Sequence, residues 1–266
     1  MGNKIFIGFC TTILLCGNAL AKENVKTIFP GILFNSVIDN QINHTSIDGD
    51  TDWAFGINGF GNSANLRGTK NGESWTAQTV GTTVSGLLSI TPNLIVGAGY
   101  VYGITDIPSG HIDSHTGFIY SRYQHGEVYA RGMFSYGVSN YSNTDVKNLG
   151  VQAFFGKELM PHITFEVGGR YINFDSGEKS DLLTAVGNVE YKRNFVVGTA
   201  ITMAPKVNFG ISSDVAKNSD LEPCGLNTGV GVDMQYHNFG IVLDYEFEVR
   251  HNYIEHTGYL KFKYIL

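Results

Sequence analysis

His111, Asp113 and His115 are the residues whose types and spacing come nearest to a chemical site. In an extended chain, residues two apart share a face, so the two imidazoles and the carboxylate could reach one metal ion. Nothing nearby in the sequence supplies a fourth ligand. We therefore place the three residues in a flexible connection that follows a strand, and we predict no metal site and no cofactor.

Sequence motifs of common enzymes are missing as well. The chain holds no Gly-x-Ser-x-Gly, His-Glu-x-x-His or Cys-x-x-Cys motif. Cys10 and Cys16 fall in a predicted leader, so Cys224 would remain as a lone free thiol in a turn. We predict no catalytic residue and no enzyme activity. The enzyme alternative is a hydrolase, which would need a nucleophile and a base that no spacing here singles out.

Residues 1–21 have the three parts of a secretory signal. Lys4 is the positive start, Ile5–Cys16 is the apolar stretch, and Ala19-Leu20-Ala21 is a cleavage site. We predict cleavage after Ala21 and export of the rest. The remaining chain would carry one positive charge fewer than the full chain's −6, which is −7. This balance disfavours nucleic acid as a partner.

Residues 22–52 form a linker with a helical pattern inside it. Apolar residues recur at helical spacing directly after Pro30-Gly31, and polar residues separate them. The pattern predicts a short amphipathic helix over about 31–43. Its apolar positions are Leu33, Phe34, Val37, Ile38 and Ile42, and its polar positions are Asn35, Asp39, Asn40 and Asn43.

From Trp53 to Leu266, apolar and polar residues alternate with the period of two typical of β-strands. No apolar run approaches the roughly 20 residues of a transmembrane helix. We predict twelve strands, over residues 53–61, 75–89, 94–104, 114–124, 127–139, 146–158, 162–174, 182–193, 196–212, 226–236, 239–250 and 255–266.

The last strand illustrates the two faces. Leu260, Phe262, Tyr264 and Leu266 fall on one side, and two lysines fall on the other. A soluble barrel of twelve strands would have an interior too wide for side chains to fill. An apolar face toward lipid and a polar face toward a lumen resolve this, so we predict an all-β, twelve-stranded antiparallel transmembrane barrel at 53–266, with the helix inside or at the pore.

The predicted connections alternate in length. Those after even-numbered strands are short, such as Thr91-Pro92-Asn93, whereas those at 62–74, 105–113, 140–145, 175–181 and 213–225 are longer and polar. Short periplasmic turns and long external loops are typical of outer-membrane barrels, and this pattern puts both chain ends on the periplasmic side.

Charged residues opposite the apolar faces are the candidate lumen residues. An Arg or Lys facing the middle of the bilayer would cost about 2–4 kcal/mol, which favours inward placement. Inside, the charges can pair across the lumen, bind the polar residues of the helix, or line a path for ions or small solutes. These residues are Arg131, Glu166, Arg170, Glu190, Lys192, Lys206, Asp233, Asp244, Glu246, Glu248, Lys261 and Lys263.

The strand series resembles the translocator β-domain of autotransporters, the type V secretion barrels. The resemblance spans about 53–266 and is a patterned series rather than one sharp motif. It is carried by WAFGINGFG at 53–61, NLIVGAGYVYG at 93–103, GEVYARGMFSYG at 126–137, APKVNFG at 204–210, GVGVDMQ at 229–235, DYEFE at 244–248 and the final alternation to Leu266.

The resemblance implies a barrel of the Gram-negative outer membrane whose pore is threaded by an N-terminal helix. It implies outer-membrane lipid, the outer-membrane assembly machinery and periplasmic chaperones as partners, with Leu260, Phe262, Tyr264 and Leu266 as the assembly signal. The family's large passenger has only residues 22–52 in its place, so we expect a translocator-like pore or scaffold without a substantial passenger. The alternatives are a porin-like channel and an outer-membrane barrel hydrolase.

Overall fold

The computed structural model describes residues 25–43, 53–67, 74–142, 144–175, 179–198, 200–217 and 224–266. The predicted signal sequence lies outside the described residues. The elements are α2 (Val25–Asn43), β1 (Trp53–Leu66), β2 (Trp75–Thr91), β3 (Leu94–Ile107), β4 (Gly110–His125), β5 (Val128–Tyr141), β6 (Thr144–Met160), β7 (Ile163–Asp175), β8 (Lys179–Lys192), β9 (Phe195–Val197), β10 (Ile201–Lys217), β11 (Cys224–Tyr236), β12 (Phe239–Arg250) and β13 (Tyr253–Ile265).

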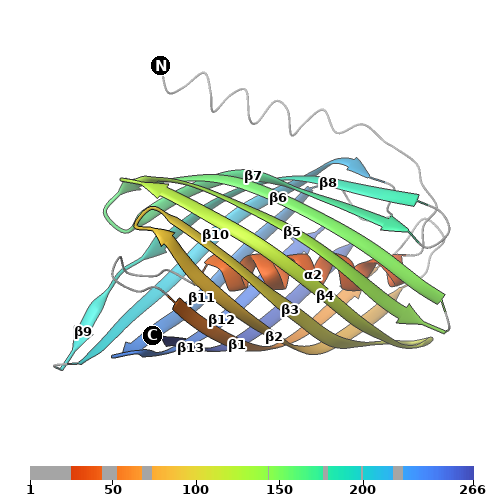
Figure 1. The fold of residues 1–266 in the computed structure, drawn as a ribbon. Helices are drawn as coiled ribbons and strands as arrows, with labels where there is room; N and C mark the ends of the chain where they lie inside the picture. Colours follow the sequence, from red (N-terminus) through yellow and green to blue (C-terminus); the bar gives the residue numbers. More distant parts are fainter. Residues whose placement is uncertain are drawn as a thin grey trace, which may run out of the picture.

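The strands form one antiparallel sheet that closes on itself (Figure 1). Each barrel strand pairs with its neighbours in sequence, and β1 closes the ring by pairing with β13, from Ala54↔Ile265 to Leu66↔Tyr253. Closure leaves the barrel strands without an open edge, as a bilayer requires. We call the end where β1 begins and β13 ends the C-terminal rim, and the other end the opposite rim. The predicted twelve-stranded antiparallel barrel is confirmed.

The thirteenth ladder segment, β9, continues β8 after an interruption opposite Pro205. Pro205 has no N–H, so the carbonyl of Arg193 opposite it gains no backbone hydrogen bond from it. The N–H of Arg193 still donates to the carbonyl of Pro205 at 3.2 Å. Pairing resumes at Met203↔Phe195. The chain therefore has twelve barrel strands although its sheet has thirteen segments.

Side chains alternate between lipid and lumen along each strand. On β12, Leu243 is 45% exposed on the outer face, while its neighbour Asp244 is 8% exposed and points inward. On β13, Phe262 is exposed and Lys261 is buried in the same way. A strand in a closed membrane barrel must show this period, because its two faces meet different media.

The expected long polar connections were wrong at several places. The residues predicted as the loop 105–113 continue the β3–β4 hairpin, with Thr105 paired to Ile112 and only two residues between the strands. The loop predicted at 140–145 is likewise mostly strand. These stretches look like loops because their outer faces are polar. A strand that extends past the lipid meets water on its outer face, so it can remain paired without apolar residues there.

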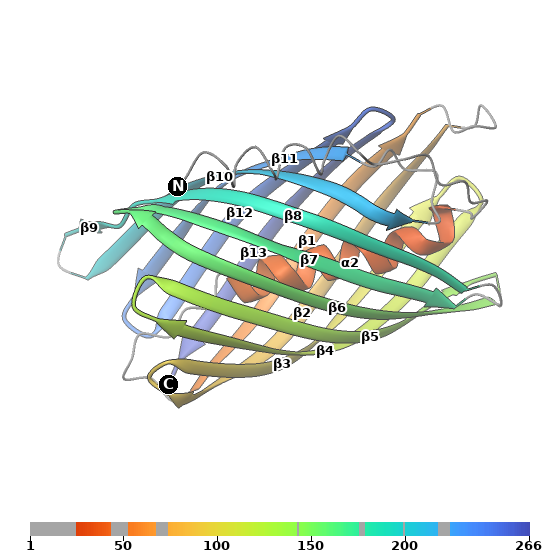
Figure 2. The same ribbon diagram turned by 90° about the horizontal axis from the view of Figure 1, so that it is seen from above.

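Helix α2 lies inside the barrel along its axis (Figure 2). It begins at Val25, six residues before the predicted start at residue 31, and it contains Pro30. At Gly31 the helix lies close to the wall, because a Cβ added there would lie 2.6 Å from the ring of Phe174. Among the described residues, no helix has the length and apolar character needed to cross a bilayer.

The outer face of β12 gives a direct test of the membrane orientation. Replacing Leu243 with Arg should impair insertion, since an arginine near mid-membrane costs about 2–4 kcal/mol. Folding into lipid vesicles, followed by the heat-dependent mobility shift on gels, measures the folded fraction. Leu243→Phe is the matched control and should fold normally. Equal folding of both variants would mean that this face does not meet lipid.

Candidate functional site

The candidate site is the lumen where α2 meets the barrel wall. The apolar face of the helix, from Phe29 to Ile38, packs on an apolar patch of the inner wall. Phe29 meets Trp75 edge-on with ring centroids 5.8 Å apart, and Phe34 meets Phe60 in the same geometry at 6.0 Å. The patch is formed mainly by β1 to β5, with Tyr253 and Tyr259 of β13, and includes Phe60, Leu66, Trp75, Leu87, Val101, Ile112, Phe118, Tyr120 and Met133.

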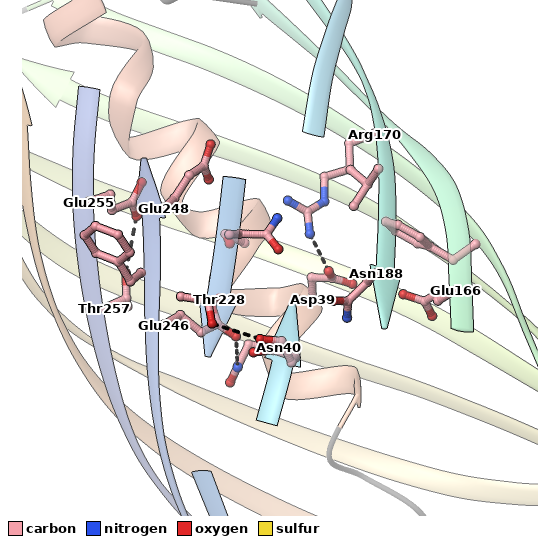
Figure 3. Close-up of a pocket in the computed structure, with 16 residues that line it drawn as sticks. Asp39, Asn40, Glu166, Arg170, Asn188, Thr228, Glu246, Glu248, Glu255 and Thr257 are labelled. Carbon is pink, nitrogen blue, oxygen red and sulfur yellow. Dashed lines mark hydrogen bonds and ion pairs between the residues drawn. The ribbon is translucent and has the colours of Figure 1, made fainter. Parts of the chain in front are cut away.

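Asp39 is the helix's main polar anchor. One carboxylate oxygen pairs with Arg131, and the other accepts a hydrogen bond from Arg170 at 2.5 Å (Figure 3). Arg131 also donates two hydrogen bonds of 2.7 Å to Glu166, and its guanidinium stacks 4.1 Å from the centroid of the Phe154 ring. Arg131, Glu166 and Asp39 are all buried. This network joins the helix to β5 and β7.

This network positions α2 in the lumen more than it adds to the free energy of unfolding. Desolvating buried charges offsets much of their mutual attraction, but removing one partner from such a set costs about 3–5 kcal/mol. Because Asp39 bonds two arginines from different strands, it fixes both the depth and the rotation of α2 in the lumen.

The last described turns of the helix have their own polar contacts. Lys261 donates from Nζ to the backbone carbonyl of Asn40 at 2.9 Å. Its positive charge there also interacts favourably with the negative end of the helix dipole. The side-chain amide of Asn40 donates to Glu246 at 2.5 Å. Gln41 donates to the hydroxyl of Ser85 at 2.9 Å. The carboxyl-terminal part of α2 is thus tied to β2, β12 and β13.

Asn35, one turn before Asp39, anchors the middle of the helix. Its side-chain oxygen accepts a hydrogen bond from Ser135 at 3.0 Å, and its backbone carbonyl accepts one from Gln152 at 3.1 Å. All three residues are buried. Polar contacts therefore follow the helix over about two turns on the side facing β5 and β6.

A small polar cavity of about 80 Å³ remains between α2 and the wall. Asp39 and Asn40 line it from the helix, and Arg170, Glu246 and Glu255 line it from the strands (Figure 3). This volume holds only a few water molecules. Helix α2 thus leaves small polar cavities beside Asp39 and Asn40.

The candidate lumen charges predicted from the sequence lie on the inner face. They form two groups: the Arg131, Glu166 and Arg170 group around Asp39, and a second group on β8 and β10 to β13. In the second group, Lys206 lies 2.7 Å from Asp244 and 3.5 Å from Asp233. The further pairs of this group are Lys192 with Asp233, and Lys261 with Asp244 at 3.4 Å. Glu190 lies on the same inner face and lines a small pocket with Lys206.

Several residues of the network were not among the predicted site residues. Asp39 was assigned only to the polar side of the helix. Glu255 is buried on β13 and accepts a hydrogen bond from Asn62 at 2.6 Å. Asp214 pairs with Arg250 at 2.7 Å. The alternation of β12 and β13 could have revealed Arg250 and Glu255, whereas the partners of Asp39 depend on where the helix stops in the pore.

The remaining predicted residues lie on the outer face. The proposed assembly signal, Leu260, Phe262, Tyr264 and Leu266, is exposed on β13 and just after it. His111, Asp113 and His115 belong to β4 rather than to a connection, so that expectation was wrong. Their side chains alternate with buried Ile112 and Ser114, and the described residues contain no group of three or more potential metal ligands.

Residues 53–155 match the autotransporter beta-domain family model. The translocator domain of the autotransporter NalP from Neisseria meningitidis is similar in fold, with a TM-score of 0.71 and 13% identity over 90% of this chain and 96% of that one. The beta domain of the Bordetella autotransporter Brka gives a TM-score of 0.63 and 11% identity, covering 80% of this chain and 99% of that one.

An outer membrane channel from Pseudomonas putida F1 is similar as well, with a TM-score of 0.58 and 11% identity over 84% of this chain and all of that one. No curated protein matches the chain. At these identities the solved structures establish the fold, and the family model adds the sequence pattern of β1 to β6. The chain therefore has the fold of autotransporter translocator β-barrels, and residues 53–155 also carry the sequence pattern of the autotransporter beta-domain.

Proposed function

We propose that this barrel is a translocator-like pore of the outer membrane that its own helix keeps closed. The observation that carries the proposal is the fit of α2, whose apolar side packs on Trp75 and Phe60 while Asp39 bonds both Arg131 and Arg170. A helix held on two sides by different forces blocks the lumen and leaves a cavity of about 80 Å³.

The direction of the helix supports a translocator. Phe29 lies beside Trp75 at the start of β2, near the opposite rim, and Asn40 lies beside Lys261 near the C-terminal rim. The chain thus runs from the opposite rim through the lumen and enters β1 at the C-terminal rim. We propose that the C-terminal rim faces the periplasm, so that any segment before α2 would emerge outside the cell.

The porin-like channel is the second candidate, because the fold is also that of an outer membrane channel. It differs in what the intact chain should do, since a porin-like lumen would conduct steadily with the helix in place. We propose a transport role rather than the hydrolase alternative. A hydrolase needs a base beside its nucleophile, whereas two histidines of the outer face that could act as bases, His115 and His256, bond to Tyr100 and Tyr245.

Assembly follows the same proposal. We propose that the signal at residues 1–21 is removed near Ala21 and that periplasmic chaperones deliver the chain to the outer-membrane assembly machinery. The outward row Leu260, Phe262, Tyr264 and Leu266 would be the recognition signal. Its exposure on the closing strand supports this role, since it remains accessible until lipid surrounds the barrel.

Deleting residues 22–50 should open the pore. The mature chain should show only rare, brief openings in a planar bilayer, while the deleted chain should show sustained conductance steps, because the polar side of the lumen loses its cover. Both proteins are folded in detergent and checked by heat-dependent gel mobility first. Steady conductance by the intact chain would favour the porin-like channel, and silence of a folded deleted chain would refute the plug.

A reversible lock tests the plug without removing it. Asn35→Cys and Ser135→Cys, in a Cys224→Ser background of the mature chain, replace two side chains that are hydrogen-bonded at 3.0 Å. Oxidised protein should show no spontaneous openings, and a reductant should restore them to the level of the Cys224→Ser parent. Openings that are equally frequent in both redox states would show that conduction does not need helix movement.

Removing the anchor should loosen the plug. Asp39→Asn takes the negative charge away from two buried arginines, and a loss of about 3 kcal/mol corresponds to roughly a hundredfold higher open probability. Ser36→Ala is the control, because Ser36 lies on the same helix and lines the same cavity. Single-channel recording compares the two variants. An Asp39→Asn trace that matches the control would show that packing alone holds the helix.

A further inference from the structure

One hairpin projects past the C-terminal rim. The neighbouring strand β7 begins only at Ile163, which pairs with Tyr191 of β8. Beyond that point the hairpin continues through β9, whose Val197 pairs with Ile201 of β10. Figure 1 shows β9 and the adjoining end of β10 extending outward from the barrel at the end where the C terminus lies.

The outer edge of β9 is open for strand pairing. The N–H of Lys192 donates to His162 on the β7 side at 2.9 Å, and the N–H of Arg193 donates to Pro205 of β10 at 3.2 Å. Backbone groups alternate in direction along a strand, so the N–H and C=O of Asn194 and Val196 point away from β10. Within the described part of the chain, β9 pairs with β10 alone.

The side chains of β9 are apolar and exposed. Phe195 is 43%, Val196 is 74% and Val197 is 48% exposed. Tyr191, on the outer face of β8, lies four residues earlier, where an aromatic side chain suits the membrane interface. The β9 residues therefore lie on the aqueous side of that level. Exposed Leu159 and Met160, at the end of β6, add apolar surface beside the adjoining β6–β7 turn.

Natural edge strands are usually protected by charge, by proline or by a covering segment. On β9, three consecutive apolar residues and an unpaired backbone edge occur together. The charged residue that flanks β9 is positive: the guanidinium of Arg193 lies 5.0 Å from the centroid of the Phe195 ring. At the end of β6, exposed Lys157 and Glu158 carry opposite charges. A partner segment with both apolar and acidic side chains matches this surface.

We propose that the open edge of β9 binds an extended segment of a periplasmic protein by strand addition. The segment pairs with the backbone of Asn194 and Val196, places apolar side chains against Phe195 and Val197, and sets a carboxylate near Arg193. The contact is short, so binding is weak and reversible, as in transient complexes.

A peptide probe tests the proposal on the intact folded chain in nanodiscs. The probe is a fluorescein-labelled ten-residue peptide of alternating valine and glutamate, and the matched probe carries proline at two of the valine positions. Fluorescence anisotropy should show saturable binding of the first probe and at least about fivefold weaker binding of the second, because proline removes edge donors.

Two variants of one residue separate backbone pairing from side-chain contact. Val196→Pro removes the edge N–H and leaves the β9–β10 hydrogen bonds in place, so the affinity should fall about fivefold or more. Val196→Thr retains the N–H and is the matched control, with affinity within about twofold. Arg193→Gln should weaken binding and reduce its salt dependence. Unchanged gel mobility shows that each variant is folded.

Three results would overturn the proposal. The first is equal binding of both probes, or no binding of either at millimolar peptide. The second is an added Trp emission in Val196→Trp nanodiscs without peptide, over that of the parent's Trp53 and Trp75, that brominated lipid quenches, since β9 would then lie in lipid. The third is a concentration-dependent dimer in sedimentation that Val196→Pro abolishes, since the occupant would then be a second copy.

Discussion

The structure depends on one constraint, the need to satisfy every backbone N–H and C=O group inside lipid. Water is absent there, so a sheet can span the bilayer only if its first and last strands pair. The ladder from Ala54↔Ile265 to Leu66↔Tyr253 meets this demand. Closure then fixes the alternation of faces, because each residue of a closed ring points either to lipid or to the lumen. It also fixes the diameter, which for twelve strands leaves an interior that wall side chains cannot fill.

Helix α2 resolves the problem of the wide interior. Its apolar side covers Phe60 and Trp75, and its polar side places Asp39 between Arg131 and Arg170. A uniformly apolar helix would not suit the charged half of the wall, and a uniformly polar helix would not suit the apolar half. The lumen is therefore divided into a mainly apolar side on β1 to β5 and a charged side that begins at Arg131 of β5 and continues on β7, β8 and β10 to β13. The division explains why aromatic residues face inward in a barrel whose lumen was expected to be polar.

The sequence predicted the faces better than the ends of the strands. Alternation is a local property, so the inward placement of Arg131, Glu166 and Lys261 follows from neighbours two residues away. Strand ends depend on the partner strand instead: Thr105 is part of β3 because Ile112 lies opposite it. The partners of Asp39 are 92 and 131 residues away. Their meeting requires a helix depth that contacts such as Gly31 against Phe174 set, and no local pattern encodes it.

The two kinds of contact on α2 have different consequences for opening. If the helix left, Trp75, Phe118 and Tyr120 would face water in the pore, and that cost scales with their apolar area at roughly 25 cal/mol per Å². The ion pairs behave otherwise, since Arg131 would keep Glu166 and regain water as a second partner. Packing therefore resists full departure of the helix, while Asp39 determines its resting depth. Loss of the anchor alone would let the helix slide along its apolar track before it leaves the lumen, so partial openings precede complete ones.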